Sequence, residues 1–239
     1  MAKEKNRVFR MKQFSVDDSR SAMKVGTDGV LVGAWADVDD ARRVLDVGCG
    51  CGLIALMMAQ RTIEAEVVAL DIDCDSVAQA QVNFDNSPWC SRLSLYCIDY
   101  NEFNDGPFDL IVSNPPFFTN GVLPPEASRS AARHDDTLPL ESLISHSAAL
   151  LAPEGRLTFI TPVEARSLVV EAATFSGLAV SRITAVVPVA GHAPKRMLWE
   201  LRPRMSVVDT IESILVMENP PQGFTDEYVA LVSPFYLYL

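Results

Sequence analysis

Apolar and polar positions along the chain follow two alternating patterns. Short apolar runs that end at glycine or polar residues are typical of buried strands, and longer segments with apolar residues three and four positions apart are typical of helices. The first pattern predicts strands over residues 42–48, 66–73, 93–100, 108–112 and 155–161. The second predicts helices over residues 53–61, 76–84, 138–151 and 163–177. This alternation predicts an α/β fold with a mainly parallel sheet.

The remainder of the chain is less regular. Two apolar segments, 179–189 and 196–203, predict a final strand pair, and residues 225–237 predict a last helix. The interval 117–137 shows no regular pattern, and loops of this length are often functional. Since the chain has neither an internal repeat nor a clear linker, we expect residues 1–239 to form one domain.

Composition narrows the class of protein. The chain has 239 residues, of which 49% are hydrophobic and 21% are charged, which is enough for a sizeable core. Its apolar runs stay below the roughly 18 residues of a membrane span. The five cysteines are odd in number and lack Cys-x-x-Cys spacing, which argues against both a disulfide framework and a zinc site. We therefore expect a reduced, cytoplasmic protein without a bound metal.

The net charge of −11 argues against a general nucleic-acid coat, yet two segments are basic. Residues 1–24 hold seven lysines and arginines against three acidic residues. Residues 192–204 hold four basic residues against Glu200, and these are Lys195, Arg196, Arg202 and Arg204. The two segments are either solvated surface or arms that bind phosphate beside an acidic body.

A glycine-rich turn lies between the first predicted strand and the helix that follows it. The stretch "LDVGCGCG" (45–52) places Gly48, Gly50 and Gly52 in this turn. Glycine lets the backbone turn tightly and approach a ligand, and the helix start offers free N–H groups. The spacing is Gly-x-Gly-x-Gly and not the Gly-x-Gly-x-x-Gly of a dinucleotide site.

Carboxylates follow the next two strands. Asp71 ends the second strand 19 residues after Gly52 (71 − 52), where an acidic group can accept hydrogen bonds from both ribose hydroxyls. Asp99 ends the third strand, with Tyr100 beside it, and Asp46 stands just before the turn, where it could face an ammonium group. Parallel strands end at one edge of a sheet, so these groups predict a nucleoside site there.

Four motifs together resemble the class I S-adenosylmethionine-dependent methyltransferases: "LDVGCGCG", "ALDID" (69–73), "CIDY" (97–100) and "SNPPFF" (113–118). The resemblance implies a Rossmann-like α/β fold, with a mainly parallel seven-stranded sheet, an antiparallel edge strand and helices on both faces. It implies that the glycine turn faces the methionine end of S-adenosylmethionine. It also implies that the residues after the second and third strands hold the ribose and adenine, namely Asp71, Ile72, Asp99 and Tyr100.

The resemblance makes "SNPPFF" the acceptor site for a methyl group. An exocyclic amine on a base is a poor nucleophile because its lone pair is delocalised into the ring. Asn114 can accept one amine hydrogen with its side-chain oxygen, and Pro115 can accept the other with its carbonyl. Pro115 and Pro116 hold these acceptors rigidly, and Phe117 can stack on the base. A second Asn-Pro-Pro (219–221) lacks the adjacent aromatic residue and predicts a tight turn.

The wider sequence resembles the bacterial tRNA adenine-N6 methyltransferases along nearly its full length. The resemblance is carried by residues 10–36, 113–118, 128–144 and 228–239. It implies a tRNA partner contacted at the anticodon region, with methylation of the adenosine 3′ of the anticodon in a valine tRNA. It also implies that Lys24 to Asp28, with Thr27 among them, lie near the methionine end of the cofactor. Residues 1–40 would form a basic N-terminal extension packed on the cofactor side.

Two alternatives to a tRNA adenine-N6 methyltransferase remain open from sequence. The acceptor motif also serves enzymes that methylate a guanine amine of ribosomal RNA. A cofactor-binding or RNA-binding protein without chemistry is a third possibility, although it would have no need for preorganised acceptors. In the interval 117–137, Arg129, Arg133 and His134 could contact the anticodon loop or could be solvent-exposed.

Overall fold

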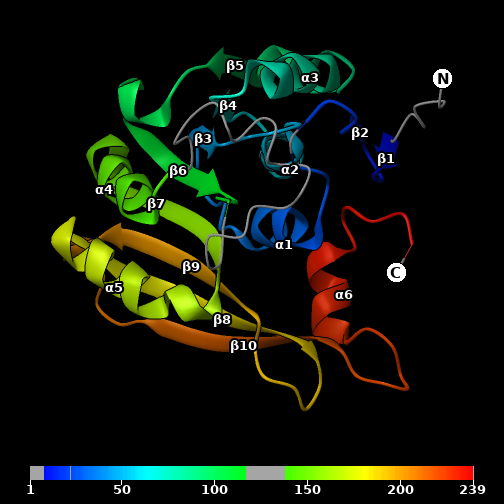
Figure 1. The fold of residues 1–239 in the computed structure, drawn as a ribbon, viewed down its shortest axis with the longest axis vertical. Coiled ribbons are helices and arrows are strands. Elements are labelled where there is room, and N and C mark those ends of the chain that lie inside the picture. The colour runs from blue at the N-terminus through cyan, green and yellow to red at the C-terminus, as the bar shows by residue number, and fades with distance from the viewer. Residues whose placement is uncertain (1–7, 22, 117–137, 239) are drawn as a thin grey trace, which may run out of the picture.

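The computed structural model describes residues 8–21, 23–116 and 138–238. A large sheet runs through the centre of this part of the chain (Figure 1). It contains eight described strands in the order β10-β8-β9-β7-β6-β3-β4-β5. Their bounds are β3 Arg43–Val47, β4 Glu66–Asp71, β5 Leu93–Cys97, β6 Phe108–Ser113, β7 Leu151–Pro162, β8 Leu178–Val189, β9 Arg196–Pro203 and β10 Ile211–Glu218.

The predicted mainly parallel sheet is confirmed, but two of its details were wrong. The described strands number eight rather than seven, and the antiparallel strand β9 lies inside the sheet, between β7 and β8. The additional strand β10 pairs in parallel with β8 and forms the edge. Its first four residues are exposed, so its sequence "IESILVME" lacks the continuous apolar run of a buried strand.

Helices cover both faces of the sheet (Figure 1). One apolar cluster contains buried residues of α1 (Thr27–Trp35), α2 (Leu53–Arg61), α3 (Cys74–Asp85) and α6 (Asp226–Val232). The other contains buried residues of α4 (Leu140–Leu150) and α5 (Arg166–Phe175). Helices on both faces explain why the central strands are apolar throughout.

Helix α1 was not predicted because it is apolar on every side. Its residues from Gly29 to Trp35 are all buried, so its sequence has no polar face to mark a helical period. Gly33 allows α1 to approach α2, since a Cβ at this position would lie 2.7 Å from Sδ of Met57. Near the start of both helices, a Cβ at Gly29 would lie 3.3 Å from a methyl carbon of Leu53, so the start of α1 is packed close to the start of α2.

The N-terminal segment forms a small ribbon and then follows α3. Strands β1 (Val8–Arg10) and β2 (Ser15–Asp17) pair antiparallel. The Asp17 N–H donates to Oδ1 of Asn83 at 2.9 Å, and Ser19 Oγ lies 3.3 Å from Oε1 of Gln79. The chain therefore runs along α3 toward the start of this helix.

Hydrogen bonds among residues 18–21 and 23–25 hold the segment that precedes α1. The buried Asp18 accepts a hydrogen bond from the Val25 N–H at 2.9 Å. The Lys24 ammonium donates to the carbonyls of Asp18, Ser19 and Ser21 at 2.6, 3.1 and 3.1 Å. Lys24 thus stabilises the approach to the glycine turn.

Every helix in the described part of the chain is too short or too polar to cross a membrane. The same residues also lack a group of three His, Cys, Asp or Glu side chains that could hold a metal ion.

Candidate cofactor and acceptor site

The ends of β3, β4 and β6 bring the glycine turn between two predicted site residues. Val47 at the end of β3 pairs with Leu70 of β4 on one side and with Ser113 of β6 on the other. The buried Ser113 hydroxyl donates to the Val47 carbonyl at 2.8 Å and fixes this register. One residue beyond these pairs, Gly48 follows β3, Asp71 follows Leu70 and Asn114 follows β6. Gly48 is therefore flanked by Asp71 and Asn114 at neighbouring strand ends.

The glycine turn has a backbone that other residues rarely adopt. Gly48, Gly50 and Gly52 have φ values of +69°, +54° and +81°, in the left-handed region. A Cβ at Gly52 would lie 2.5 Å from the Phe84 ring, so the inner side of the turn is filled. A Cβ at Gly48 would have no described atom within 4 Å, and Gly48 is exposed. A ligand can therefore approach the backbone at Gly48.

Asp71 holds the turn and retains capacity for a ligand. Its Oδ2 accepts the Gly50 N–H at 2.8 Å, and its Oδ1 accepts the Asp73 N–H at 2.9 Å. A carboxylate has about four acceptor positions, so two hydroxyl donors can still be accommodated. Partial burial raises the pKa of Asp71 above its ordinary value, and the charge of Asp73 adds to this effect.

Asp46 lies beneath the turn and is fully buried. Its Oδ2 accepts the Ala55 N–H at 2.9 Å, which fixes the first turn of α2. Its Oδ1 has no hydrogen-bond partner among the described residues. Burial, with a smaller contribution from the Asp71 charge, raises the pKa of Asp46 to about 7. Burying Oδ1 of Asp46 without a hydrogen bond costs folding free energy, and this atom lies beneath the exposed glycine backbone.

Asp99 and Tyr100 have different surroundings although they are adjacent. Asp99 is partly exposed, and its Oδ1 accepts the Asn101 N–H at 2.8 Å. The Tyr100 ring is buried, and its hydroxyl lies 2.7 Å from Oγ of Ser147 in α4. The Tyr100 side chain thus belongs to the core beneath the site. Ile72 is 47% exposed beside Asp71 and offers an apolar surface to a base.

The acceptor motif follows β6 directly. Asn114 and Pro116 are half-buried and Pro115 is buried, whereas Phe117 lies outside the described residues. The Asn114 Nδ2 atom lies 3.9 Å from the Cβ position of Gly29 in the first turn of α1. Thr27, the first residue of α1, is exposed at the same end of the helix. The start of α1 is therefore packed beside the acceptor motif.

An ion pair that the sequence did not reveal anchors this end of α1. Nε of Arg196 donates to Oδ2 of Asp28 at 2.8 Å, and both side chains are about one-third exposed. Arg196 begins the antiparallel β9 and pairs with Pro162, the last residue of β7. It therefore lies at the carboxyl edge of the parallel strands, although 168 residues separate it from Asp28.

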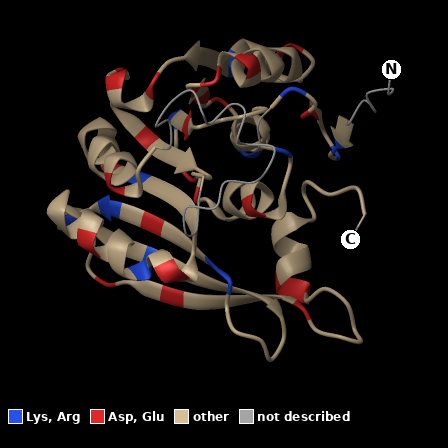
Figure 2. Ribbon diagram, viewed as in Figure 1, with Lys and Arg blue, Asp and Glu red and all other residues tan. Residues whose placement is uncertain are grey.

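The basic segment 192–204 does not form one patch. Lys195 is exposed and directly precedes Arg196 at the carboxyl edge. Arg202 pairs with Ala179 near the start of β8, at the opposite edge. There it donates to the buried Glu200 at 2.9 Å and lies 3.4 Å from Asp37. Basic and acidic residues are interspersed along the ribbon (Figure 2).

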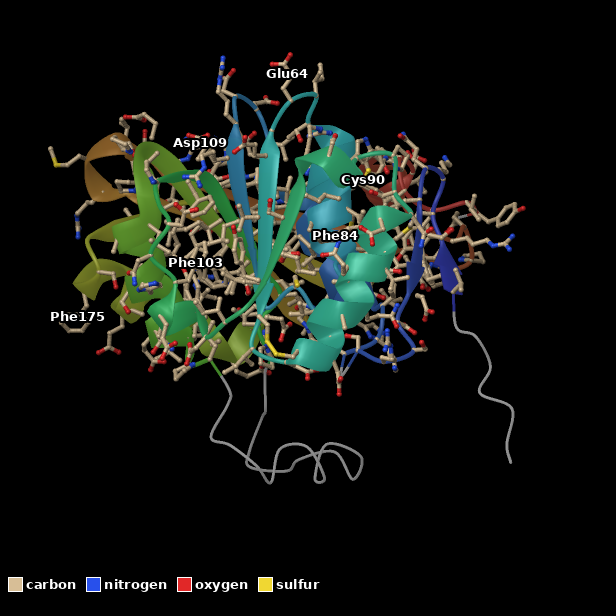
Figure 3. The ribbon with its side chains drawn as sticks, turned by 90° about the horizontal axis from the view of Figure 1, so that it is seen from above. Glu64, Phe84, Cys90, Phe103, Asp109 and Phe175 are labelled. Atoms are coloured by element: carbon tan, nitrogen blue, oxygen red, sulfur yellow. A yellow bond between two sulfur atoms is a disulfide. The ribbon has the colours of Figure 1, made fainter. Side chains whose placement is uncertain are left out.

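A disulfide bond joins Cys74 and Cys97, with Cα atoms 5.4 Å apart. The sequence argued against a disulfide framework and for a reduced protein, and this one disulfide departs from that expectation. The two residues are 23 positions apart and lack a recognisable spacing, but the sheet register places Cys97 opposite Asp71. The bond lies at the carboxyl ends of the strands, whereas Glu64 and Asp109 lie at the other end of the sheet (Figure 3).

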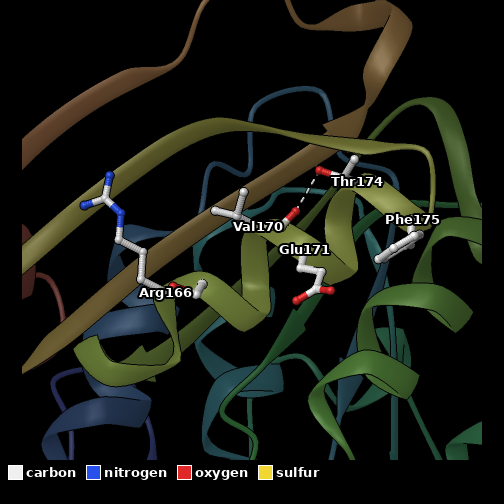
Figure 4. A pocket seen from close by; sticks show the side chains of 6 residues that line it. Arg166, Val170, Glu171, Thr174 and Phe175 are labelled. Atoms are coloured by element: carbon white, nitrogen blue, oxygen red, sulfur yellow. Dashed lines mark hydrogen bonds between the residues drawn. The ribbon is translucent and has the colours of Figure 1, made fainter.

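The outer face of α5 carries a shallow hollow of about 550 Å³ (Figure 4). It is lined by Arg166, Ser167, Val170, Glu171, Thr174 and Phe175. Figure 4 shows the Arg166 guanidinium pointing away from the Glu171 carboxylate. Without convergent polar groups, and away from the strand ends, this hollow is a poor candidate for chemistry.

Comparison with known proteins gives the family. Residues 19–166 match the model of the methyltransferase small domain. The chain belongs to the methyltransferase small domain family. A tRNA1(Val) (adenine(37)-N6)-methyltransferase of Phocaeicola vulgatus is 45% identical over 233 residues, covering 97% of this chain and 98% of the relative. A protein of the same name from Parabacteroides distasonis is 42% identical, with the same coverage.

Solved structures support the fold of this methyltransferase. A predicted O-methyltransferase from Agrobacterium tumefaciens superimposes with a TM-score of 0.67 at 20% identity, covering 87% of this chain and 96% of its own. A ribosomal protein L11 methylase from Lactobacillus delbrueckii subsp. bulgaricus superimposes with a TM-score of 0.57 at 18% identity, covering 79% and 84%. At such identities the likeness concerns the Rossmann-like fold alone.

Proposed function

We propose that this methyltransferase transfers a methyl group from S-adenosylmethionine to the N6 amine of an adenosine in tRNA. We further propose that the target is the adenosine 3′ of the anticodon in a valine tRNA. The observation that carries the proposal is the position of Asn114 beside Gly48, which puts an amine acceptor next to a nucleoside-type turn. The two relatives named above carry this activity in their names over nearly the full chain.

The residues at the strand ends suit S-adenosylmethionine. The exposed backbone at Gly48 and the start of α1 at Thr27 can receive its methionine end. Asp46 below can ionise beside the ammonium group, because a nearby positive charge favours the charged carboxylate. The free acceptor positions of Asp71 match two ribose hydroxyls. Ile72 and Asp99 can contact the face and the amine of the adenine. When bound, the cofactor supplies an activated methyl group on a sulfonium.

The chain itself has to make the target amine nucleophilic. The side-chain oxygen of Asn114 and the carbonyl of Pro115 accept the two amine hydrogens and turn the nitrogen lone pair toward the methyl carbon. Because the first is fixed by the strand end and the second by a proline, little reorganisation is needed in the transition state. The methylated nitrogen then loses a proton to solvent, so a strong base is not required.

The proposal includes a tRNA partner and a cytoplasmic location. Residues 1–40 would act as an N-terminal extension on the cofactor side, with the basic excess in residues 1–24. Of its described part, Asp17 and Ser19 bond to α3, and Asp18 accepts a hydrogen bond from the Val25 N–H shortly before α1. Lys195 at the carboxyl edge can contact phosphate. In an anticodon loop the target base is already partly unstacked, so moving it into the site costs less than in a duplex.

Mass spectrometry of nucleosides tests the proposal. Purified protein is incubated with S-adenosylmethionine and, separately, with unmodified tRNA and ribosomal RNA pools. We expect N6-methyladenosine in tRNA, concentrated in valine tRNA. Methylguanosine as the main product in ribosomal RNA would favour the guanine-amine alternative. Cofactor binding without any methylated nucleoside would favour a protein without chemistry.

A further inference from the structure

The disulfide bond lies between the two segments that border the proposed adenosine site. Cys74 is the first residue of α3, and Cys97 is the last residue of β5. Cys97 is the register partner of Asp71, the carboxylate suited to the ribose. The yellow bond in Figure 3 lies near the start of α3, away from Phe103. The bond therefore ties the end of β4 and the start of α3 to the end of β5.

The segments joined by this bond carry the groups suited to the ribose and the base. Asp71 and Ile72 precede Cys74, and Asp99 follows Cys97 by two residues. The Ile98 N–H donates to the Asp71 carbonyl at 3.0 Å, which is a first tie between the segments. The disulfide is a second tie and joins them covalently. The register of β4 and β5 sets the spacing of Asp71 and Asp99, and the disulfide adds a covalent tie that can be broken.

The disulfide is open to thiol exchange, whereas two other cysteines are not. Cys74 and Cys97 are both exposed. Cys49 and Cys51 are buried thiols, and burial raises the pKa of Cys49 well above 9 and that of Cys51 to about 11, so neither forms a reactive thiolate at neutral pH. Exposed disulfides in reducing compartments are usually redox-sensing or transient.

We propose that Cys74 and Cys97 form a reversible thiol–disulfide site that sets the affinity of the cofactor site. A small dithiol reduces the pair: two electrons and two protons pass to the cysteines, the S–S bond breaks, two thiols form, and the dithiol closes to a cyclic disulfide. The start of α3 and the Asp99 turn then lose their covalent tie. Part of the binding free energy must order them again, so the reduced form binds the cofactor more weakly.

The inference rests on the proposed cofactor site and is tested by calorimetry with S-adenosylhomocysteine. The full chain is titrated after air oxidation and again after reduction with dithiothreitol. We expect Kd to rise about three- to tenfold on reduction, the range expected when one or two groups must be ordered on binding. The Cys74→Ser/Cys97→Ser double variant should bind like the reduced protein in both conditions.

Cys90 offers a matched control because it is an exposed free cysteine near the start of β5. The Cys90→Ser variant should stay as sensitive to dithiothreitol as the wild type. Equal Kd values for the oxidised and reduced wild type would overturn the inference and leave the cofactor site standing. An absence of binding in both forms would overturn the cofactor site itself. Rapid alkylation of Cys74 or Cys97 before reduction would also overturn the inference, because it would show that the bond is not formed.

Discussion

The chain contains Asn-Pro-Pro twice, and the two copies have different surroundings. Asn114 follows β6 and Asn219 follows β10, and both strands end at the same edge of the sheet. The strand order places them four strands apart, which is roughly 19 Å at about 4.8 Å per strand. The two sites therefore share a sequence and an edge of the sheet, but they do not share neighbours.

The neighbours give each copy its role. Asn114 lies beside the exposed glycine backbone of Gly48 and beside the start of α1. Around the second copy, the Asn219 N–H donates to the Gly223 carbonyl at 2.8 Å, and the Gln222 N–H donates to the Asn219 carbonyl at 2.9 Å. The second copy therefore closes a turn that leads into α6. An amine-acceptor role needs adjacent strands that carry a cofactor turn, and the tripeptide alone does not provide it.

The largest expected effect is on the methylation rate, and it should distinguish substitution of Asn114 from substitution of Asn219. Asn114→Ala should lower the single-turnover methylation rate by about a hundredfold or more, as for loss of one preorganised polar group in a transition state. Affinity for S-adenosylhomocysteine should stay near that of the wild type, because Asn114 faces the acceptor and not the cofactor. Quenched assays with labelled cofactor and tRNA measure the rate, and calorimetry measures the affinity.

Asn219→Ala is the matched control and should leave the rate unchanged. A methylation rate near wild type in Asn114→Ala would remove the acceptor assignment. An equal loss in both variants would show that the comparison is wrong and that the two turns share a structural role.

Much of the region around Asn114 could be predicted from sequence, because each of its strands and turns has a short local sequence pattern. The strands β3, β4 and β6 are apolar runs, and the glycine turn and Asp71 stand at their ends. Tyr100 could not be placed in this way. Asp99 precedes a short 3-10 helix that begins at Tyr100, and this turn directs the tyrosine ring to the core, where its hydroxyl lies 2.7 Å from Oγ of Ser147.

Two features that the sequence did not reveal depend on contacts between distant segments. The Asp28–Arg196 ion pair and the Cys74–Cys97 disulfide each join residues that meet only through the strand order. The edge strand β10 was missed because it is largely exposed, and exposure removes the apolar pattern that marks a strand.

Two buried carboxylates, Asp46 on β3 and Glu200 on β9, allow a second comparison, between an unpaired and a paired buried charge. Asp46 on β3, next to β6, has no cationic partner within the described salt bridges, and burial raises its pKa to about 7. Its folded-state pKa exceeds its unfolded value, so its contribution to stability is full below about pH 4 and is lost as the pH rises through about 7. Between pH 5 and pH 7 the wild type should lose roughly 2–3 kcal/mol relative to Asp46→Asn, as measured by urea unfolding of the cofactor-free protein.

Glu200 on β9 is the control, because it is buried but paired with Arg182 at 3.1 Å and with Arg202 at 2.9 Å. Glu200→Gln should destabilise the protein at neutral pH, since it leaves two guanidinium groups without their partner. Asp46→Asn should instead be at least as stable as the wild type at pH 7, and it should bind S-adenosylhomocysteine more weakly. A parallel pH dependence of stability in Asp46→Asn and the wild type would contradict the assignment of an ionisable, uncompensated Asp46.

The smallest expected effect concerns the surroundings of the second Asn-Pro-Pro. The Ala190 N–H donates to the Glu218 carbonyl at 2.8 Å, so this turn lies next to the β8–β9 connection that carries Lys195. Lys195 is exposed at the carboxyl edge, where tRNA would have to lie to reach Asn114. Lys195→Glu should weaken tRNA binding severalfold and lower the slope of log K against log salt by about one phosphate contact.

Arg204→Glu makes the same charge change at the opposite edge, where the Arg204 N–H bonds the Gly177 carbonyl, and it should leave both quantities unchanged. Filter binding of tRNA at several salt concentrations gives the slopes of the wild type and both variants. Since the two variants have the same net charge, any difference between them reports the position of the charge and not the total. Equal slopes for Lys195→Glu and Arg204→Glu would mean that the edge near Asn219 has no specific part in RNA binding. The second Asn-Pro-Pro would then only form a turn. A lower slope for Lys195→Glu alone would mean that this turn also helps to position a phosphate-binding lysine.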